Sequence, residues 1–454
     1  MSVHVIVLAA GKGTRMRSNL PKVLHTLAGR PLLRHVLDTA IALESVVSVV
    51  YGHGGDAVRQ AINDDSINWV LQDQQLGTGH AVKLAMPGVS DADTVLVMYG
   101  DVPLIHADTL AALVDESRNA GGLAVLTMAL EQPGAYGRIL RGSDGVVQAI
   151  VEAGDATAEQ LAIREINTGF VAAPAGQLRK WVARLEANNA QGEFYLTDIV
   201  ALAVADGGCV SAVQASDAWE IEGVNSRKQL AALERVYQHR QAEALMEHGV
   251  TLADPARLDI RGLTEIGRDS FVDINVVFEG DNSLGENVSI GPNCHIMNSR
   301  IAHGATIHAN SVLENADVGP NCNVGPFARL RPGSVLAENA RIGNFVETKK
   351  AEIGAGSKVN HLSYVGDSEV GSNVNIGAGV ITCNYDGVNK HKTVIKDNAF
   401  IGSDSQLIAP VTVGEGAFIG SGTTLSRNAP DGELTLTRSP QRTVKGWKPP
   451  VKKP

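Results

Sequence analysis

The sequence predicts an α/β domain with a Rossmann-like, mostly parallel sheet, followed by a linker helix and a left-handed parallel β-helix of hexapeptide repeats. Short apolar runs alternate with longer amphipathic runs in the first half, as they do in parallel α/β sheets. Branched apolar residues recur every six positions in the second half, a period that neither a helix nor a flat strand has. The 48 glycines and only 4% aromatic residues also suit a fold with many turns and few bulky side chains.

The first domain is expected to cover residues 1–225. Its strands are expected at Val3–Ala10, Val46–Tyr51, Asn68–Gln72, Thr94–Tyr99 and Gly122–Leu130. Its helices are expected at Leu32–Leu43, Asp56–Ile62, Gly79–Met86 and Thr109–Ala120. Residues 226–249 form one amphipathic stretch that can end at Gly249, and their length suits a linker helix between two domains.

The second domain is expected to cover residues 250–454. A three-sided coil with six residues per side needs one inward apolar residue on each side and small residues at its corners. The expected inward residues are Ile266, Val272, Phe278, Leu284, Ile290, Ile296, Ile301, Ile307, Leu313, Val318, Val324, Leu330, Leu336, Ile342, Ile353, Val359, Val365, Ile395, Ile401, Leu407, Val413, Ile419 and Leu425. Two segments, 344–350 and 383–392, depart from this repeat and are expected to be surface loops.

Charge and composition exclude several classes of protein. A net charge of −10 argues against a general nucleic-acid binder, and no apolar run is long enough to cross a membrane. The first residues lack the positive segment of a signal peptide, so a cytoplasmic protein with no nucleic-acid or membrane partner is expected. The cysteines are too few and too widely spaced for a disulfide scaffold or a zinc site, and Cys209, Cys294 and Cys322 are expected to be packing residues.

A glycine-rich loop with several cations follows the first expected strand. Gly11 and Gly13 let backbone amides approach phosphate oxygens, and Arg15 and Lys22 would neutralise the phosphate charge. The spacing matches neither the Walker loop nor the dinucleotide fingerprint, so a tight turn beside a solvated basic face is the alternative. Asp101 ends another strand, where open α/β sheets place ligands, and is either a helix cap or a ligand of Mg²⁺.

The motifs together resemble those of the sugar-1-phosphate uridylyltransferases. They are L-A-A-G-K-G-T-R-M at 8–16, L-G-T-G-H-A at 76–81, Y-G-D-V-P at 99–103, Y-G-R-I at 136–139, E-I-N-T-G at 165–169 and E-G-V-N at 222–225. With the hexapeptide repeats behind them, the whole chain resembles the family of bacterial bifunctional enzymes that form UDP-N-acetylglucosamine. The resemblance implies acetylation of glucosamine-1-phosphate with acetyl-CoA, then transfer of UMP from UTP to N-acetylglucosamine-1-phosphate with release of pyrophosphate. The product would serve peptidoglycan and lipopolysaccharide synthesis.

The resemblance also implies a uridylyl site in the first domain. Arg15 and Lys22 would be its catalytic cations, and Asp101 and Asn225 would hold Mg²⁺. The substrate contacts would be Leu8, Ala9, Ala10, Gly11, Gln72, Gly77, Thr78, Tyr99, Gly100, Asp101, Gly137, Glu152, Asn167 and Asn225. Among these, Gly137, Glu152 and Asn167 would bind the N-acetylglucosamine, although the residues alone leave Glu152 and Asn167 as ordinary polar surface residues.

Some residues of the second domain fall outside the inward register. Arg331 directly follows inward Leu330 and should point outward, and His361 lies two residues past inward Val359. Ser403 and Ser421 are eighteen residues apart, one full coil, and should stack along an edge. The basic C-terminal tail, which contains Trp447, either meets coenzyme A phosphates or is a solubilising end.

The resemblance implies an acetyl site on this domain, between the subunits of a homotrimer. His361 would be the general base that deprotonates the sugar amine, since histidine titrates near neutral pH. Arg331 and Lys349 would bind the sugar phosphate, and Tyr364 and Asn375 would orient the sugar. The acetyl-CoA contacts would be Ala378, Asn384, Tyr385, Ser403, Ser421 and Arg438. Two other functions stay open, a single-activity nucleotidyltransferase with an assembling β-helix and a non-catalytic nucleotide-sugar sensor.

Overall fold

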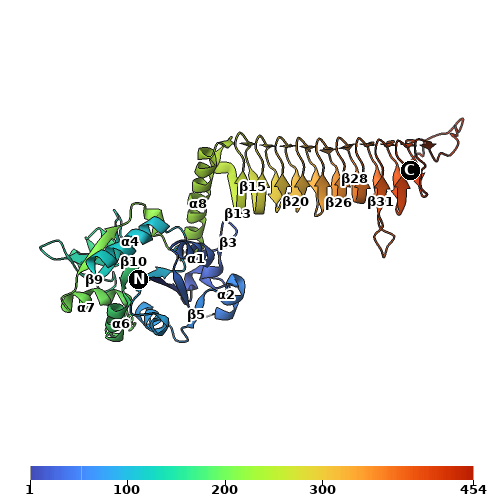
Figure 1. Ribbon diagram of the computed structural model, residues 1–454. Coiled ribbons are helices and arrows are strands. Elements are labelled where there is room, and N and C mark those ends of the chain that lie inside the picture. The colour runs from blue at the N-terminus through green and yellow to red at the C-terminus, as the bar shows by residue number, and fades with distance from the viewer. Residues whose placement is uncertain (1, 53, 453–454) are drawn as a thin grey trace. The chain divides into compact units, whose positions relative to one another are not determined.

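The computed structural model describes residues 2–52 and 54–452 (Figure 1). The chain divides into two compact units between Tyr237 and Gln238. The division falls inside helix α8, Arg227–Glu247, where a linker helix was expected over residues 226–249. No helix of the described residues is long and apolar enough to cross a membrane.

The first unit is built on one mixed sheet with helices against it (Figure 1). Its strand order is β11-β7-β10-β6-β1-β4-β5, and only β10 runs antiparallel to its neighbours on this path. The strands are β1 Val3–Ala9, β4 Val46–Tyr51, β5 Asn68–Leu71, β6 Thr94–Tyr99, β7 Leu123–Ala129, β10 Glu165–Pro174 and β11 Val210–Gln214, with the pairs β2 Thr26–Leu27 and β3 Arg30–Pro31, and β8 Arg138–Arg141 and β9 Val147–Val151. The helices are α1 Leu32–Ala42, α2 Gly55–Ile62, α3 Thr78–Ala85, α4 Ala107–Ala120, α5 Ala158–Leu161, α6 Ala175–Ala183 and α7 Ile199–Ala205.

The mostly parallel α/β fold predicted for this unit is confirmed. Each strand and helix expected before residue 131 is present, with ends that differ by at most a few residues. The elements that the periodicity did not identify are the short pair β2 and β3 and the elements that follow residue 131, from β8 to β11. Strand β10 inserts antiparallel between β6 and β7, so its place in the sheet could not be read from local pattern.

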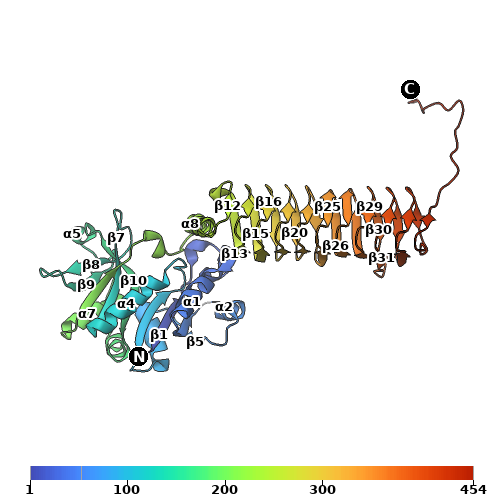
Figure 2. The same ribbon diagram turned by 45° about the horizontal axis from the view of Figure 1, so that its top comes forward.

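The second unit is a three-sided coil of parallel strands, which confirms the predicted parallel β-helix (Figure 2). The first face contains β12 Thr251–Leu252, β14 Phe271–Val272, β16 Ser289–Ile290, β19 Thr306–Ile307, β22 Asn323–Val324, β25 Arg341–Asn344, β27 Lys358–His361, β29 Asn375–Ile376, β32 Phe400–Ile401, β35 Phe418–Ile419 and β37 Leu434–Thr435. The described residues after β37 form no helix or strand and leave the last coil as an extended segment (Figure 2).

The other two faces join in one sheet because four long strands bend around the corner between them. These strands are β13 Leu258–Ile266, β15 Val276–Leu284, β26 Glu347–Ile353 and β28 Tyr364–Val370. The second face adds β17 His295–Met297, β20 Val312–Glu314, β23 Arg329–Leu330, β30 Ile381–Cys383, β33 Gln406–Ile408 and β36 Thr424–Leu425. The third face adds β18 Arg300–Ile301, β21 Asp317–Val318, β24 Ser334–Leu336, β31 Thr393–Ile395 and β34 Val411–Val413.

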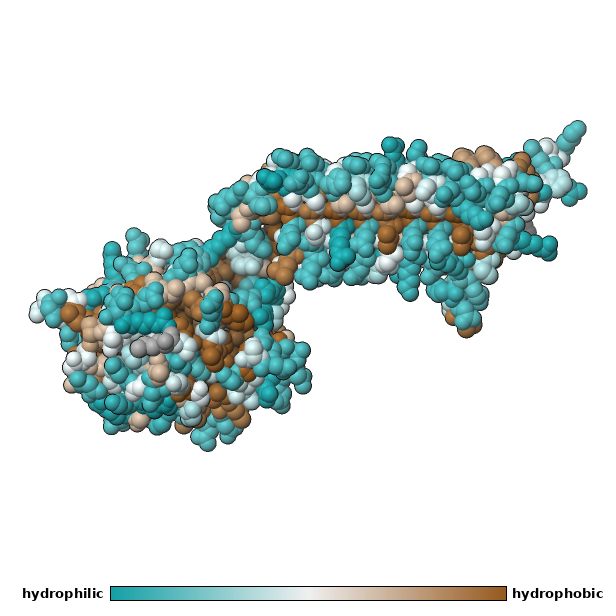
Figure 3. Space-filling view, viewed as in Figure 1, coloured by the Kyte–Doolittle hydropathy of each residue, from teal (hydrophilic) through white to brown (hydrophobic). Residues whose placement is uncertain are grey.

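The core of the β-helix follows the predicted register. Every apolar residue that was expected to point inward is at most 4% exposed. Strand pairing places these residues above one another, as in Ile290 on Ile307 and Val324 on Ile342. In the space-filling view, apolar residues form a band along the coils between rows of hydrophilic residues (Figure 3).

One of the two expected surface loops is present, and the prediction of the other is wrong. Residues 383–392 leave the coil between β30 and β31 and project from the β-helix (Figure 1). Residues 344–350 instead continue the regular coil in β25 and β26, with Thr348 fully buried in the inward position. Thr348 is tolerated there because its hydroxyl forms a hydrogen bond with that of Ser334 at 2.8 Å.

The predicted packing role of Cys209 is wrong, since Cys209 is exposed, whereas Cys294 and Cys322 are buried.

Candidate active sites

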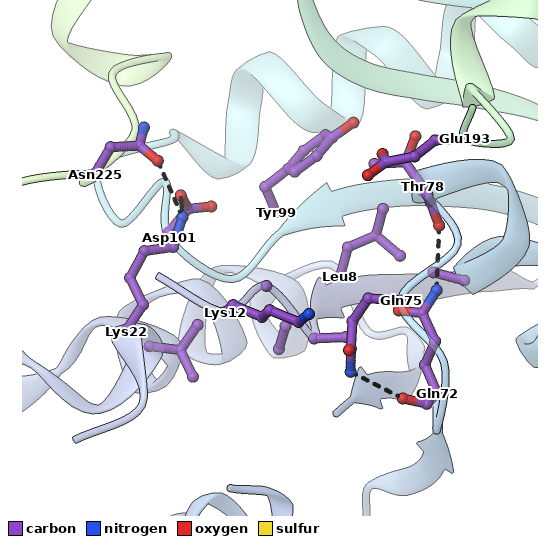
Figure 4. Close-up of a pocket in the computed structure, with 16 residues that line it drawn as sticks. Leu8, Lys12, Lys22, Gln72, Gln75, Thr78, Tyr99, Asp101, Glu193 and Asn225 are labelled. Carbon is purple, nitrogen blue, oxygen red and sulfur yellow. Dashed lines mark hydrogen bonds and ion pairs between the residues drawn. The ribbon is translucent and has the colours of Figure 1, made fainter. Parts of the chain in front are cut away.

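A cavity of about 530 Å³ lies at the carboxyl ends of β1 and β6 in the first unit (Figure 4). Parallel α/β sheets place ligands at this edge because the loops that follow the strands diverge there. The predicted residues that line the cavity are Leu8, Ala9, Ala10, Gly11, Lys22, Gln72, Gly77, Thr78, Tyr99, Asp101 and Asn225. Five segments of the sequence therefore meet at one site.

One side of the cavity holds a compact group of charged and polar side chains (Figure 4). The Lys22 ammonium is ion-paired with Asp101 and donates to Asn225 Oδ1 at 3.2 Å. Arg15, on the short 3₁₀ helix Thr14–Met16, donates to the same Asn225 oxygen at 2.9 Å. Two cations thus converge on the pair of oxygens that was predicted to bind Mg²⁺.

The Asp101 and Asn225 oxygens fit a hard divalent cation. A single cationic group, the Lys22 ammonium, already reaches both oxygens, so a metal ion placed between them would meet two oxygen ligands. No cluster of three or more histidine, cysteine or acidic side chains suited to a metal occurs among the described residues. One carboxylate and one amide oxygen match the sparse protein ligation that Mg²⁺ has when substrate phosphates complete its shell.

The other side of the cavity is formed by the start of α3 and the segment before it (Figure 4). The buried Gln72 side chain donates to Gly77 O at 3.1 Å and lies 3.1 Å from His80 Nδ1, so its amide is held in place. Gly77 has φ +109°, and a Cβ there would lie 2.6 Å from the Phe194 carbonyl oxygen. Only glycine fits this turn, which explains the glycine that precedes Thr78.

Gly137, Glu152 and Asn167 lie together on the β8–β9 hairpin and β10. Asn167 N donates to Gly137 O at 2.9 Å, and a Cβ on Gly137 would lie 3.3 Å from a Glu152 carboxylate oxygen. Tyr99 lines the cavity, and burial raises the pKa of its phenol above the ordinary value, with smaller contributions from Glu152 and Asp101. Gly137, Glu152, Asn167 and Arg15 do not line the cavity itself, and neither does Gly100, which is buried.

In the second unit, His361 lies at the corner between the first and second faces. Strand pairing stacks Val359, Ile376, Ile401 and Ile419 in successive coils. The residues two positions later therefore lie at the same corner of these coils, and they are His361, Ala378, Ser403 and Ser421. The predicted stacking of Ser403 and Ser421 is therefore confirmed. His361 is exposed, and its Nδ1 lies 3.2 Å from Asn344 Oδ1, one coil earlier.

The remaining residues predicted for the acetyl site divide between two faces. Arg331 and Lys349 follow Leu330 and Thr348, which pair in successive coils of the second face. Tyr364 lies on the same face and accepts from Asn384 Nδ2 at 3.3 Å. Asn375 lies on the first face, in β29. At the end of the corner row, Arg438 donates to Ser421 O at 3.3 Å, and Tyr385 is exposed on the projecting loop.

Comparisons with known proteins match both units. A model of the MobA-like NTP transferase domain matches residues 5–250, one of the GMPPB C-terminal domain matches residues 260–353, and one of the bacterial transferase hexapeptide (six repeats) matches residues 392–427. The "Bifunctional protein GlmU" of Marinobacter nauticus is 56% identical over 453 residues, 99% of each chain. The chain belongs to the GlmU family. A protein of the same name from Alkalilimnicola ehrlichii is 55% identical and covers 100% of this chain and 98% of its own.

Membership of the GlmU family confirms the predicted function, a bifunctional uridylyltransferase and acetyltransferase that makes UDP-N-acetylglucosamine. The two alternatives, a single-activity enzyme and a non-catalytic sensor, are not supported. A crystal structure of UDP-glucose pyrophosphorylase complexed with UDP-glucose is also similar, at 18% identity and a TM-score of 0.45, and covers 53% of this chain and 100% of its own. That likeness is too weak to add to the assignment.

Several residues of the cavity in this GlmU-family chain were not predicted from the sequence. Lys12 lies between the two sides of the cavity, Glu193 lies beside Thr78, and Gln75 Nε2 donates to Gln72 O at 3.3 Å (Figure 4). Lys12 belongs to the glycine-rich loop that the sequence analysis identified, so its positive charge could have marked it as a further candidate for the site. Glu193 had no such signal, because it comes from a segment more than a hundred residues after Thr78 that only the fold brings back to α3.

Glu152 is expected to lower the stability of the first unit at neutral pH. Burial raises the pKa of its carboxyl above the ordinary value of 4.5, although Thr197 Oγ1 donates to it at 3.2 Å. Because the folded state holds this proton more tightly than the unfolded state, the free energy of unfolding falls as pH rises through the interval above 4.5. Glu152→Gln is therefore expected to raise the urea midpoint at about pH 7 and to change it little at about pH 4.

Tryptophan fluorescence can follow this unfolding, since Trp69, Trp181 and Trp219 lie in the first unit. Glu159→Gln, at an exposed position on α5, is the control and should leave both midpoints unchanged. Equal midpoints for Glu152→Gln and the wild type at both pH values would show that the carboxylate carries no burial cost.

Proposed function

We propose that this GlmU-family chain transfers UMP in the cavity of the first unit and the acetyl group at the His361 corner of the β-helix. The observation that supports the first assignment most directly is the convergence of Lys22 and Arg15 on Asp101 and Asn225 at the edge of the cavity. The substrates would be UTP, glucosamine-1-phosphate, N-acetylglucosamine-1-phosphate and acetyl-CoA. The cytoplasmic setting stays a prediction.

In the uridylyl reaction, a phosphate oxygen of N-acetylglucosamine-1-phosphate would attack the α-phosphorus of UTP. A new oxygen–phosphorus bond forms, the bond to the β-phosphate breaks, and its electron pair leaves with pyrophosphate. Such a transfer needs alignment and charge stabilisation more than a protein nucleophile. Lys22 and Arg15 would supply positive charge, and the Leu8–Gly11 loop and the held amide of Gln72 would orient the nucleotide.

Gly137, Glu152 and Asn167 would bind the sugar beside this reaction centre. Their mutual contacts support this assignment, and the Glu152 carboxylate is one of the charges that raise the pKa of Tyr99, which lines the cavity. Asp101 and Asn225 would hold Mg²⁺, which when bound neutralises charge on phosphate oxygens. The neutral Tyr99 phenol would keep its proton and remain a hydrogen-bond donor at the wall of the cavity.

In the acetyl reaction, His361 Nε2 would take a proton from the amine of glucosamine-1-phosphate. The neutral amine nitrogen then bonds to the acetyl carbon and the carbon–sulfur bond breaks. The nitrogen loses a second proton and the departing sulfur gains one, so coenzyme A leaves as the thiol. The Asn344 side-chain oxygen can only accept a hydrogen bond, so it favours the tautomer with the proton on Nδ1 and a free lone pair on Nε2. Asn344 would thus be a positioning residue for the base.

The acetyl site would be completed by another subunit of a homotrimer. Arg331 and Lys349 lie on the second face and Asn375 on the first face, while His361 occupies the convex corner between them. Two faces of one prism point away from each other, so a single chain cannot enclose a sugar with both. The row from His361 to Ser421 would then be the edge along which extended acetyl-CoA lies.

The two activities can be separated with one mixture. The purified chain is supplied with glucosamine-1-phosphate, acetyl-CoA, UTP and Mg²⁺, and free thiol and pyrophosphate are followed separately. We expect thiol release without UTP, and pyrophosphate release only when acetyl-CoA or N-acetylglucosamine-1-phosphate is present. Pyrophosphate release from glucosamine-1-phosphate and UTP alone would contradict the proposed order of the reactions.

Asn344 offers a test of how the base is positioned. Asn344→Ala is expected to lower kcat for thiol release about tenfold with little change in KM for acetyl-CoA, because the imidazole loses its fixed tautomer. Asn344→Asp keeps an acceptor and is expected to restore most of kcat. Since a carboxylate favours protonated imidazole, the acidic limb of the pH–rate profile should move to higher pH in the aspartate variant. Equal profiles for both variants and the wild type would remove Asn344 from this role.

A further inference from the structure

Glu220 is an acidic residue enclosed in the core of the first unit. It ends the short 3₁₀ helix Ala218–Glu220, and it is 0% exposed. Acidic side chains are almost never buried to this extent unless they are paired. Asn225, one of the two proposed ligands of Mg²⁺, follows five residues later in the sequence. Neither proposed reaction uses the Glu220 carboxylate, so its burial needs a separate explanation.

The Glu220 carboxylate binds the beginning of helix α4. Its Oε2 atom accepts from Thr109 Oγ1 at 2.7 Å and from His106 N, the residue before the helix, at 3.4 Å. The first amide groups of a helix lack partners within the helix and favour a negative charge beside them. Glu220 therefore caps α4 from a segment that lies 114 residues away in the sequence.

The second oxygen of this carboxylate is less well satisfied. Within the described part of the chain, Glu220 Oε1 is buried without a hydrogen-bond partner, and His106 Nδ1 lies 3.6 Å from it. An unpaired oxygen of a buried carboxylate lowers the stability of the folded state, and a well-packed apolar side chain would avoid that cost. Stability alone therefore does not account for a carboxylate at this position.

The two segments that Glu220 joins carry the two proposed metal ligands. Asp101 follows β6, and the chain runs from it to His106 at the start of α4. Asn225 lies at the end of the segment that begins with Glu220, and Asp101 and Asn225 lie on the same side of the cavity (Figure 4). The separation of their oxygens thus depends on how these two segments are held together.

Two contacts define the course of residues 220–225. Next to the metal ligands, Val224 N donates to Asp101 O at 2.9 Å, but a segment that is held at one point can still pivot about it. Glu220 fixes a second point at the start of α4, whose apolar face is buried in the core. A small displacement of the Asn225 oxygen would matter, because metal–ligand distances vary by only about 0.2 Å.

We propose that Glu220 is a positioning residue for the metal site. By tying the segment that carries Asn225 to the start of α4, it sets the separation of the two oxygens that hold Mg²⁺. This inference rests on the proposed function, in which Asp101 and Asn225 are the ligands. Glu220 does not line the cavity, so it acts through Asn225 and not by contact with a substrate. Residues that orient metal ligands in this way contribute to metal affinity.

Two substitutions test the tie itself. Glu220→Ala removes both hydrogen bonds that the carboxylate accepts from Thr109 and His106. Glu220→Gln keeps an acceptor oxygen for these two donors, and its amide can donate to a neutral His106 ring. Each full-length variant is titrated with Mn²⁺ and followed by electron paramagnetic resonance without turnover. The Mg²⁺ concentration that gives half-maximal pyrophosphate release is measured separately.

Asp206→Ala is the matched control. The Asp206 carboxylate also joins two elements of the first unit, since it follows α7 and accepts from Trp181 Nε1 at 3.1 Å and from Arg184 Nη1 at 2.7 Å. It does not line the cavity. Asp206→Ala should lower the urea midpoint, measured by circular dichroism, and leave Mn²⁺ binding unchanged.

We expect Glu220→Ala to weaken Mn²⁺ binding about tenfold and to raise the half-maximal Mg²⁺ concentration by a similar factor. Its kcat for pyrophosphate release at saturating Mg²⁺ should stay near the wild-type value, because the ligands themselves are intact. Glu220→Gln should bind Mn²⁺ nearly as tightly as the wild type. Thiol release should be unchanged in both variants, since the proposed acetyl site lies in the second unit.

Thr109→Val keeps the test valid if Glu220→Ala misfolds. It removes the donor of the 2.7 Å bond and preserves the branched shape of the side chain. This variant should weaken Mn²⁺ binding by a smaller factor than Glu220→Ala does. It should add little when combined with Glu220→Ala, because both substitutions remove the same bond.

Failure of this inference and failure of the proposed function give different results. If Glu220→Ala has a lower urea midpoint but binds Mn²⁺ as tightly as the wild type, the residue only stabilises the fold and the positioning role is overturned. If Asp101→Ala binds Mn²⁺ as tightly as the wild type, the proposed metal ligands are wrong, and the positioning role of Glu220 is wrong with them.

Discussion

Replacing His361 by alanine is expected to lower acetyl transfer about a hundredfold or more and to leave uridylyl transfer unchanged. The amine of glucosamine-1-phosphate is mostly protonated at neutral pH and cannot attack the thioester until a base removes a proton. His361 is exposed at the coil corner, and the contact of its Nδ1 with Asn344 Oδ1 would leave Nε2 available as the proposed base. Thiol release from acetyl-CoA measures the loss directly.

The comparison with another histidine variant separates this role from a general effect on the β-helix. His303 is an exposed histidine of an earlier coil, and His303→Ala is expected to keep thiol release near the wild-type rate. Raising the pH should partly restore thiol release in His361→Ala, because more of the amine is then unprotonated. Undiminished thiol release by His361→Ala would remove His361 from the role of base.

The β-helix could be predicted closely because its core uses one rule in every coil. An inward residue every six positions must be apolar to be buried without a hydrogen-bond partner, so the period is visible in the sequence itself. The rule failed where the inward position is polar, as at Thr348 and Thr382. Thr382 Oγ1 donates to Gly366 O at 3.0 Å and accepts from Gly366 N at 2.8 Å, so its burial depends on contacts one coil away.

The uridylyl cavity was predictable where its residues lie in local motifs and not where tertiary packing brings them in. The Leu8–Gly11 loop, Thr78 and Asp101 each end a strand or begin a helix, and those ends meet at one edge of a parallel sheet. Glu193 belongs to a segment without periodicity, and backbone hydrogen bonds of its neighbour Phe194 with Leu76 and Gly79 hold that segment beside α3.

Asp101→Ala is expected to lower uridylyl transfer by about a thousandfold and to leave acetyl transfer unchanged. Lys22 and Asp101 form an ion pair in which each side chain is only 14% exposed, and Asn225 lies on the same ammonium. Removing the carboxylate takes away half of the proposed Mg²⁺ ligands and leaves the Lys22 ammonium without its counter-charge. Pyrophosphate release measures the loss, and Asp115→Ala, at an exposed position on α4, is the control.

Asp101→Asn separates the two effects of that carboxylate. The amide keeps a hydrogen-bond acceptor for Lys22 and removes the negative charge, so a metal ligand role predicts that this variant is nearly as impaired as Asp101→Ala. If Asp101 serves only to position Lys22, the asparagine variant should recover most of the pyrophosphate release. Titration with Mn²⁺ in place of Mg²⁺, followed by electron paramagnetic resonance, tests the same point without turnover. Mn²⁺ binding that is as tight in Asp101→Ala as in the wild type would contradict the metal assignment, because the cation would then depend on other oxygens.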